Sequence, residues 1–394
     1  MRAVLLSVLL STTSLPMLCA QSAPRADPPV TLRLTFLGDI MAHDVNFRMN
    51  DYRDIYRGVQ DILLQDDLTV ANLEFPVDPT QPAAGYPAFN ANLVYVRAAI
   101  AAGIDAFSLA NNHSFDGREE GIFQTLRSIA ALQAGADRPL LFSGIRGNRD
   151  APHLPQTAVV RGVRIGFLAV TQFLNLPQGQ GYVDVVDYEN RDSAARFLSR
   201  VREASSSYDL FIVSFHGDQE YVREPSTGKR EFFRRIVESG ATVVYGHHPH
   251  VAQCYETVRV GGCDRLILYS MGNFVSGMSF RLDPAVPSAI PAAAGESFLL
   301  SAEVRCAGGG ASIVRVDPMP IANYRNERGE IVVAKLRDLS GGSVKISSAW
   351  RDYYSERLVL MEDFFSLCAR GAVCGTEGGA RPDASGSSRS GSAP

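Results

Sequence analysis

One pattern of apolar and polar residues recurs along most of the chain. A short run of β-branched or aromatic residues, typical of a buried β-strand, ends in a polar loop that contains glycine or asparagine. The junctions are LRLTFL before Gly38-Asp39, LTVA before Asn72-Leu73-Glu74, DAFSLA before Asn111-Asn112-His113, LFIVSF before His216-Gly217-Asp218, TVVY before Gly246-His247-His248-Pro249-His250, and LILYS before Met271-Gly272-Asn273.

Stretches with helical spacing of apolar residues lie between several of these strands. They are RDIYRGVQDILLQ, LVYVRAAIAAG, EEGIFQTLRSIAAL and REFFRRIVESGA. Strands that alternate with helices predict an α/β fold with largely parallel strands. Because ligands bind at the carboxyl ends of the strands in such sheets, we expect the polar loops to meet at one edge of the fold.

The N-terminal segment differs from this pattern. Residues 1–20 combine Arg2, the apolar run AVLLSVLL and a polar stretch, which is the layout of a cleavable signal peptide and is too short to span a bilayer. Cleavage is expected after Ala20, and a lipid anchor on Cys19 is disfavoured because Leu18 before it is not small. The sequence therefore predicts a periplasmic or secreted protein without a transmembrane segment in the mature chain.

The rest of the chain divides into three parts. Residues 31–335 form the predicted main domain. Residues 345–370, with Trp350 and Tyr354 at helical spacing, predict a C-terminal helical extension that packs on it. Residues 375–394 are rich in glycine, serine, alanine and proline without apolar periodicity, so we expect a disordered tail.

Composition and cysteine usage narrow the function classes. The net charge of -4 provides no basic face, so nucleic acid is not an expected partner. In an oxidising compartment cysteines that are close in sequence tend to pair. We therefore expect a Cys254–Cys263 bridge across a hairpin, a Cys368–Cys374 bridge that closes a small loop, and an unpaired Cys306.

Imidazole side chains are concentrated in the polar loops. The chain has seven histidines, and only His153 lies outside these loops. Neutral imidazole and carboxylate are the ligands of divalent metals such as Mn, Fe and Zn. The sequence therefore predicts a centre for one or two such ions, where two ions would activate a water and hold a phosphoryl or acyl oxygen. The proposed ligands at the strand ends are Asp39, Glu74, Asn112, His216, His248 and His250.

A catalytic pair is predicted beside these ligands. His113 follows Asn112 directly, and Asp116 stands at a spacing that can orient the imidazole. A histidine placed in this way suits a general acid that protonates a leaving group.

Further residues near the loops each have two open roles. His43 is either a ligand or a residue outside the ligand shell, and we interpret His247 as a partner of the backbone rather than a ligand. Glu220 and Tyr221 either contact substrate or only cover the loop, and Asn273 either caps the site or forms an Asx-turn.

Several segments resemble the bacterial capsule synthesis protein CapA family, which is associated with poly-gamma-glutamate capsule biosynthesis. They are FLGDIM, ANLEFPV, LANNHSFDG, SFHGDQEY, GHHPHV and YSMGNF, and they lie between about Leu34 and Phe274. The family's fold is similar to that of calcineurin-like metallophosphatases. The resemblance implies a four-layered α/β/β/α sandwich with two mixed sheets, in which TAVVRGVRIGFLAV, ESFLLSAEVRC and ASIVRVDPM belong to the second sheet.

The resemblance also implies a role for each ligand. Asp39 and His250 would hold a first metal, Glu74 would bridge, and Asn112, His216 and His248 would hold a second metal, with His113 as the catalytic histidine. The first motif of the wider superfamily is Asp-x-His, and Met41 stands here at the histidine position. The first metal therefore lacks a ligand unless His43 supplies it.

Two functions follow from these observations. The first is a secreted metal-dependent hydrolase of capsule or cell-envelope polymer metabolism, which cleaves a phosphoester or a gamma-glutamyl amide bond. The alternative is a non-catalytic subunit that binds an anionic polymer such as poly-gamma-glutamate, or a capsule synthase component. Arg223, Lys229 and Arg230 either attract such a polymer or belong to a solvated helix start.

Overall fold

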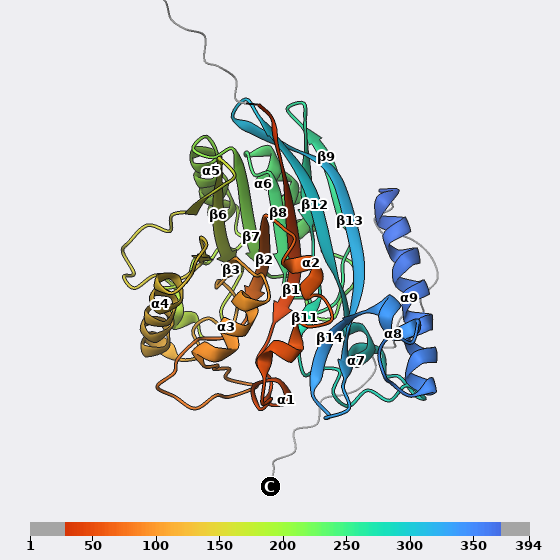
Figure 1. The fold of residues 1–394 in the computed structure, drawn as a ribbon. Helices are drawn as coiled ribbons and strands as arrows, with labels where there is room; N and C mark the ends of the chain where they lie inside the picture. Colours follow the sequence, from red (N-terminus) through yellow and green to blue (C-terminus); the bar gives the residue numbers. More distant parts are fainter. Residues whose placement is uncertain (1–27, 372–394) are drawn as a thin grey trace, which may run out of the picture.

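The structure, a computed structural model, describes residues 28–371 as two β-sheets packed face to face with helices outside them (Figure 1). The predicted signal peptide, the predicted disordered tail and Cys374 lie outside the described residues. No helix within residues 28–371 combines the length and the apolar character that crossing a bilayer requires.

The first sheet contains the N-terminal strand of the described chain at its centre. Its strand order is β14-β13-β12-β1-β2-β3-β4, with β11 also paired to β1. The pairs from β1 to β4 and the β1–β11 pair are parallel, and the pairs from β1 through β12 to β14 are antiparallel. The strands are β1 (Val30–Ile40), β2 (Leu68–Leu73), β3 (Ala106–Ser108), β4 (Leu141–Ser143), β11 (Asn273–Val275), β12 (Glu296–Ala307), β13 (Gly310–Arg325) and β14 (Ile331–Lys335).

The second sheet is also mixed, with the order β5-β6-β7-β8-β10-β9. Its inner pairs are parallel, and the edge strands β5 and β9 are antiparallel to their neighbours. The strands are β5 (Gln156–Val160), β6 (Val163–Thr171), β7 (Leu210–His216), β8 (Val243–His247), β9 (Tyr255–Val260) and β10 (Cys263–Leu268).

Two late strands lie in a different sheet from the one predicted. ESFLLSAEVRC and ASIVRVDPM form β12 and β13 of the first sheet, not strands of the second sheet, so that prediction was wrong. β12 pairs with β1 from Val30↔Cys306 to Phe36↔Leu300. Without β12, the backbone groups along this edge of a central, buried β1 would lack hydrogen-bond partners, which is costly away from water.

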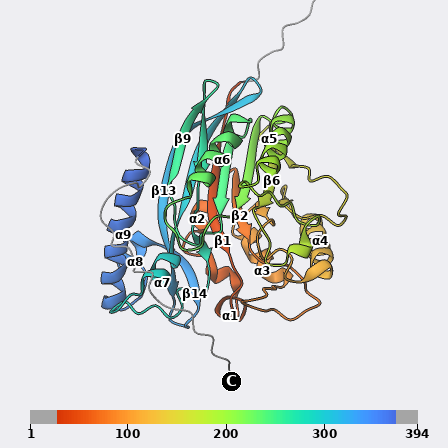
Figure 2. The same ribbon diagram turned by 180° about the vertical axis from the view of Figure 1, so that it is seen from behind.

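Helices cover the outer face of each sheet. α3 and α4 lie on the side of the first sheet, and α5 and α6 lie behind the second (Figures 1 and 2). The predicted helix RDIYRGVQDILLQ is interrupted at Gly58, where an added Cβ would overlap the backbone of β14. The helices are α1 (Asp44–Phe47), η1 (Tyr52–Ile55), α2 (Gln60–Leu63), α3 (Leu93–Ala101), α4 (Arg118–Ala134), η2 (Pro177–Gly179), α5 (Arg191–Ser205), α6 (Thr227–Glu238), α7 (Ala289–Ala294), α8 (Leu336–Ser340) and α9 (Ser348–Ala369).

The apolar core explains why the layers form. Alternate residues of a strand point to opposite faces, so each central strand contributes to two clusters. Leu210 and Ile212 of β7 pack between the sheets, whereas Phe211 and Val213 pack under α5 and α6. Because the central strands of both sheets bury both faces, the protein forms the four-layered α/β/β/α sandwich that the sequence predicted.

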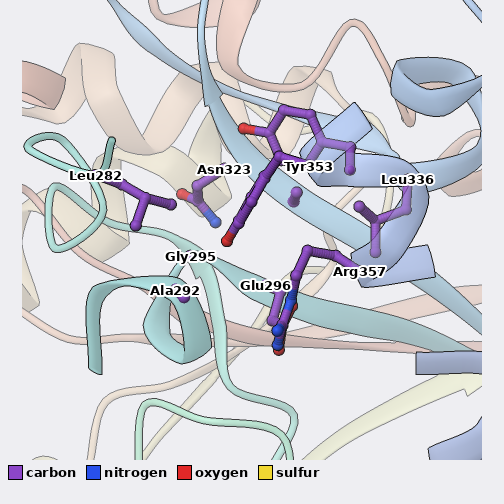
Figure 3. A pocket seen from close by; sticks show the side chains of 10 residues that line it. Leu282, Ala292, Gly295, Glu296, Asn323, Leu336, Tyr353 and Arg357 are labelled. Carbon is purple, nitrogen blue, oxygen red and sulfur yellow. The ribbon is translucent and has the colours of Figure 1, made fainter. Parts of the chain in front are cut away.

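The C-terminal helix α9 packs against the edges of both sheets. It contacts β9 and β13, and its Tyr353 and Met361 join the core between the sheets. Arg357 Nε donates to Glu296 Oε2 at 2.6 Å where β12 begins, and Figure 3 shows this pair beside Tyr353. The helix is therefore held by apolar contacts and by a partly buried ion pair.

A disulfide joins α9 to the second sheet. Cys254, just before β9, is bonded to Cys368, 114 residues later, and their Cα atoms lie 5.4 Å apart. Cys263 and Cys306 have no disulfide partner among residues 28–371. The predicted Cys254–Cys263 and Cys368–Cys374 pairs were therefore wrong, because the docking of α9 brings together two cysteines that are far apart in sequence.

We predict that replacing both Cys254 and Cys368 by serine lowers the free energy of unfolding by about 2–5 kcal/mol, because the unfolded chain loses the closure of a long loop. Urea unfolding without reductant measures this change, and Cys263→Ser is the matched control because that cysteine is free. An equal loss in the control, or no loss in the double variant, would contradict the prediction.

Candidate metal centre

Strand register in the first sheet brings three polar residues together. Asp39 of β1 pairs with Asn72 of β2 on one side and with Asn273 of β11 on the other. The close approach requires Gly38, since an added Cβ there would overlap the carbonyl group of Gly272. This glycine lets β1 run against β11 and places Asp39 at the junction of three strands.

The second sheet supplies the histidines from the ends of two neighbouring strands. β7 pairs with β8 at His216↔His247, and the loop after β8 carries His248 and His250. His216 Nε2 lies 2.8 Å from Oδ1 of Asn112, which comes from the loop after β3 of the first sheet. The centre therefore lies where the carboxyl ends of strands from both sheets meet.

Two carboxylates are fully buried in this centre. Asn72 Nδ2 donates to Asp39 Oδ1 at 2.8 Å and to Glu74 Oε2 at 3.3 Å. The opposite oxygens face His250, whose Nδ1 lies 3.3 Å from Asp39 Oδ2 and whose Nε2 lies 3.8 Å from Glu74 Oε1. Buried carboxylates are costly unless positive charge or hydrogen-bond donors compensate them.

The donor atoms fall into two sets, each able to hold one ion. The atoms of a set lie within 4.8 Å of one another, and the sets are Asp39, His216 and His247, and Glu74, His248 and His250. Glu74 Oε1 lies 3.7 Å from His216 Nε2, so this oxygen stands between the two sets. That position suits a carboxylate that bridges two ions.

A divalent metal fits these residues. Asp39 Oδ2, Glu74 Oε1 and His248 Nδ1 are buried and have no hydrogen-bond partner among the described residues. Each such atom costs roughly 1–3 kcal/mol in the absence of a partner. His248 and His250 also have positive backbone φ angles of +101° and +59°, a strained conformation that is concentrated at functional sites.

The electrostatics of the metal-free chain agree with a cation site. Burial raises the pKa of Glu74 well above its usual value, and the charge of Asp39 raises it further. Burial opposes a charge on His250, but Glu74 and Asp39 outweigh this effect and raise its pKa to about 9. Burial lowers the pKa of His216 and His248 well below the usual value, so both are neutral, as metal ligands must be.

His113 and Asp116 form a hydrogen-bonded pair beside the ligands. His113 Nδ1 donates to Asp116 Oδ2 at 2.7 Å, and the backbone N–H of Phe89 donates to the same oxygen at 2.9 Å. The ring of Phe89 packs edge-on against His113, 4.7 Å between centroids. Because Nδ1 is engaged with the carboxylate, Nε2 is the nitrogen of His113 that remains for proton transfer.

His43 and Met41 lie next to the centre rather than in either donor set. His43 Nδ1 accepts from the backbone N–H of Gly277 at 3.1 Å, and burial lowers the pKa of His43 to about 4. Met41 is 1% exposed and belongs to the apolar cluster on the outer side of the first sheet.

The other candidate residues occupy different positions around the centre. Asn273 Oδ1 accepts from His250 Nδ1 at 2.9 Å, so Asn273 orients a proposed ligand. Tyr221 is 37% exposed, with its ring centroid 6.1 Å from that of His250, and Glu220 next to it is exposed. The ring of His247 contacts the side chains of Ser214 and His216, which corrects our interpretation that it bonds the backbone.

The three basic residues after β7 do not form a free cationic surface. Lys229 is fully buried, and burial lowers its pKa to about 8. Arg223 is paired with Glu296 and Arg230 with Glu224. Their charges are therefore engaged within the protein.

Sequence reasoning assigned no role to Asn72, Asn175 and Ser214. Asn72 stands two residues before Glu74 on one strand, so strand periodicity could have placed both side chains on the same face. Asn175 Nδ2 lies 3.4 Å from His113 Nδ1, and its backbone N–H donates to Asn112 O at 3.0 Å. No sequence signal points to Asn175, because only tertiary packing brings its loop over the catalytic pair.

Comparison with known proteins relates this arrangement to capsule synthesis. Residues 33–278 match the family described as bacterial capsule synthesis protein PGA_cap. The capsule biosynthesis protein CapA of Bacillus anthracis is 28% identical over 260 residues, covering 62% of this chain and 59% of that protein. The PGA biosynthesis protein CapA of Bacillus subtilis (strain 168) is 27% identical over 255 residues, covering 62% and 63%. The chain thus matches about three fifths of the length of these relatives.

Solved structures share a more distant likeness. A hypothetical protein from Thermus thermophilus has a TM-score of 0.41 and 18% identity, covering 73% of this chain and 98% of its own. The calcineurin-like phosphoesterase YfkN from Bacillus subtilis has a TM-score of 0.38 and 14% identity, covering 86% and 99%. Likeness at this level carries no argument about the site. The family match, however, extends over more than half of the 394 residues and includes every proposed ligand, so the chain belongs to the bacterial capsule synthesis protein PGA_cap family.

Proposed function

We propose that this chain is a metal-dependent hydrolase that acts outside the cytoplasm on a capsule or cell-envelope polymer such as poly-gamma-glutamate. The observation that carries this proposal is the set of buried atoms that lack a hydrogen-bond partner among residues 28–371, Asp39 Oδ2, Glu74 Oε1 and His248 Nδ1, in one cluster beside the His113–Asp116 pair. A polar cluster that served only folding would satisfy these atoms within the protein.

The ligand roles proposed from the sequence suit the distances in the cluster. Asp39 and His250, whose Oδ2 and Nδ1 lie 3.3 Å apart, would hold one ion, and Asn112, His216 and His248 the other, with Glu74 between them. This division differs from the two compact donor sets, which place Asp39 with His216 and His250 with His248. Carboxylate and imidazole donors suit Mn, Fe or Zn. A bound divalent cation would lower the pKa of a water ligand and polarise the oxygen of the scissile group.

The protein's own residues would carry the proton and the orientation. Asp116 accepts from His113 Nδ1–H and orients the ring, and the doubly protonated imidazolium would donate its Nε2 proton to the leaving group. Phe89 packs edge-on against the imidazole, and the loop of Asn175, whose backbone N–H donates to Asn112 O, lies beside it. The same arrangement serves a phosphoester or a gamma-glutamyl amide, since both reactions expel a group that needs a proton.

A non-catalytic role in a capsule synthesis complex is the second candidate, and one observation favours it. Met41 is buried in the apolar core, and His43 is engaged with the backbone of Gly277, so one proposed ion has few ligands. A chain that binds one ion weakly could serve as a polymer-binding or synthase-binding subunit.

We predict that the purified protein takes up Mn, Fe or Zn, and that His248→Ala and His250→Ala each reduce the metal content sharply while the fold is retained. Elemental analysis after loading and desalting measures the content, and circular dichroism monitors the fold. His153→Ala is the control, because this histidine belongs to neither donor set. A wild-type protein that binds none of these metals under any loading condition would disprove the metal site.

We predict that His113→Ala lowers the turnover of a phosphoester or gamma-glutamyl substrate by about 10²–10⁴-fold, the usual contribution of a general acid. The metal content should stay at the wild-type value, because His113 is not among the proposed ligands. The comparison requires wild-type activity above a metal-free control. Full activity in the variant would remove the acid role, and intact metal with polymer binding but no turnover in wild type would favour the subunit role.

A further inference from the structure

The proposed metal ligand His216 is the first of three buried side chains linked by hydrogen bonds. His216 Nδ1 lies 2.6 Å from His247 Nδ1, and His247 Nε2 lies 2.7 Å from Ser214 Oγ. Ser214 and His216 are two residues apart on β7 and share a face, and His247 is the register partner of His216 on β8. The parallel pairing of β7 with β8 therefore builds this chain, and all three side chains are fully buried.

The opposite nitrogen of His216 faces the centre. His216 Nε2 lies 2.8 Å from Asn112 Oδ1 and 3.7 Å from Glu74 Oε1, and both of these oxygens are acceptors. Without a cation, Nε2 satisfies Asn112 only if it carries the proton. With a cation bound, Nε2 must give up that proton, because only an unprotonated nitrogen can be a ligand.

His247 and Ser214 are suited to accommodate both states. When His216 carries its proton on Nε2, its Nδ1 accepts from His247 Nδ1–H, and His247 Nε2 accepts from the Ser214 hydroxyl. When His216 carries its proton on Nδ1, both hydrogen bonds reverse. His216 Nδ1–H then donates to His247 Nδ1, and His247 Nε2–H donates to Ser214 Oγ. Imidazole and hydroxyl groups can both donate and accept, so neither state leaves these ring nitrogens unpaired.

The geometry argues against His247 as a direct ligand, although its Nδ1 is close enough to Asp39 and His216 for a shared ion. Two nitrogens bound to one metal at about 2.0–2.1 Å lie about 2.9–3.4 Å apart at octahedral or tetrahedral angles. The 2.6 Å separation of the two Nδ1 atoms is that of a hydrogen bond instead. Asp39 Oδ1 lies farther away, 3.9 Å from His247 Nδ1. Asn72 Nδ2 is 3.4 Å from His216 Nδ1, but it donates to the carboxylates of Asp39 and Glu74.

We propose that His247 and Ser214 are positioning residues that let His216 change tautomer when a metal binds, and this inference rests on the proposed metal site. As His216 Nε2 loses its proton to water, His216 Nδ1 gains one from His247 Nδ1, and His247 Nε2 gains one from water. Ser214 keeps its own proton and turns from donor to acceptor, so each residue carries the same number of protons before and after. Both rings stay neutral throughout, so the charge of the buried chain does not change.

Long-range ¹⁵N–¹H correlation spectra of histidine-labelled protein, recorded without metal and with Zn²⁺, test this proposal. We expect His216 to carry its proton on Nε2 without metal and on Nδ1 with Zn²⁺, and His247 to change from Nδ1–H to Nε2–H. Zinc binding with an unchanged His216 tautomer would overturn the switch and leave the proposed function standing. A wild type that binds none of Zn, Mn and Fe would overturn both.

Zinc titration of variants separates a positioning role from a ligand role. His247→Phe and Ser214→Ala should each weaken Zn²⁺ binding by about 10- to 100-fold, as the loss of partners of metal ligands usually does, with unchanged stoichiometry at saturation. His153→Phe is the matched control outside the centre. Loss of a whole equivalent of zinc in His247→Phe would make His247 a ligand. Ser214→Ala removes one oxygen atom and so keeps the test valid if His247→Phe does not fold; unchanged affinity in this variant would overturn the proposal.

Discussion

Asp39 and Glu74 bury two carboxylates in one pocket, and much of the surrounding structure compensates for their charge. Asn72 donates to one oxygen of each, and His250 presents a nitrogen to each of the other oxygens. The raised pKa values of Glu74 and His250 express the same conflict, because burial and the charge of Asp39 disfavour a charge on Glu74, and the two carboxylates favour a charge on His250 despite its burial. Positive φ angles at His248 and His250 show that the backbone accepts strain to hold imidazoles at this place.

Strand pairing is the means by which these groups meet. Parallel neighbours end at the same edge of their sheet, and the two sheets pack so that Asn112 of one reaches His216 of the other. Each proposed ligand therefore depends on apolar strands such as β7, whose alternate residues fill the core on both sides. The same pattern of strand residues therefore determines both the packing of the core and the geometry of the site.

The α/β class and the meeting of the polar loops could be predicted from strand patterns and from the residues at strand ends, whereas the two-sheet architecture was implied only by the resemblance to a known family. The role of His247 could not, since its partners are set by the register of β7 against β8. From the sequence, β12 was also placed in the wrong sheet, and Cys254 and Cys368 were paired with the wrong cysteines. Both features depend on contacts between segments far apart in sequence. The neighbours of Lys229 in the sequence are compatible with a solvent-exposed charge, yet this residue of α6 is completely buried.

The position of β12 has a consequence for how the chain can be divided. The family match ends at residue 278, before β12 begins at Glu296, yet β12 covers one edge of β1 from Val30 to Phe36. A fragment cut at the end of the match would leave β1 with a long, unpaired and apolar edge, which invites strand exchange and aggregation between copies. It would also lose Cys368, the partner of Cys254 four residues after His250. The boundary of family resemblance thus cuts through one folded body, because β12 and α9 beyond it pair with β1 and bond to Cys254 within it.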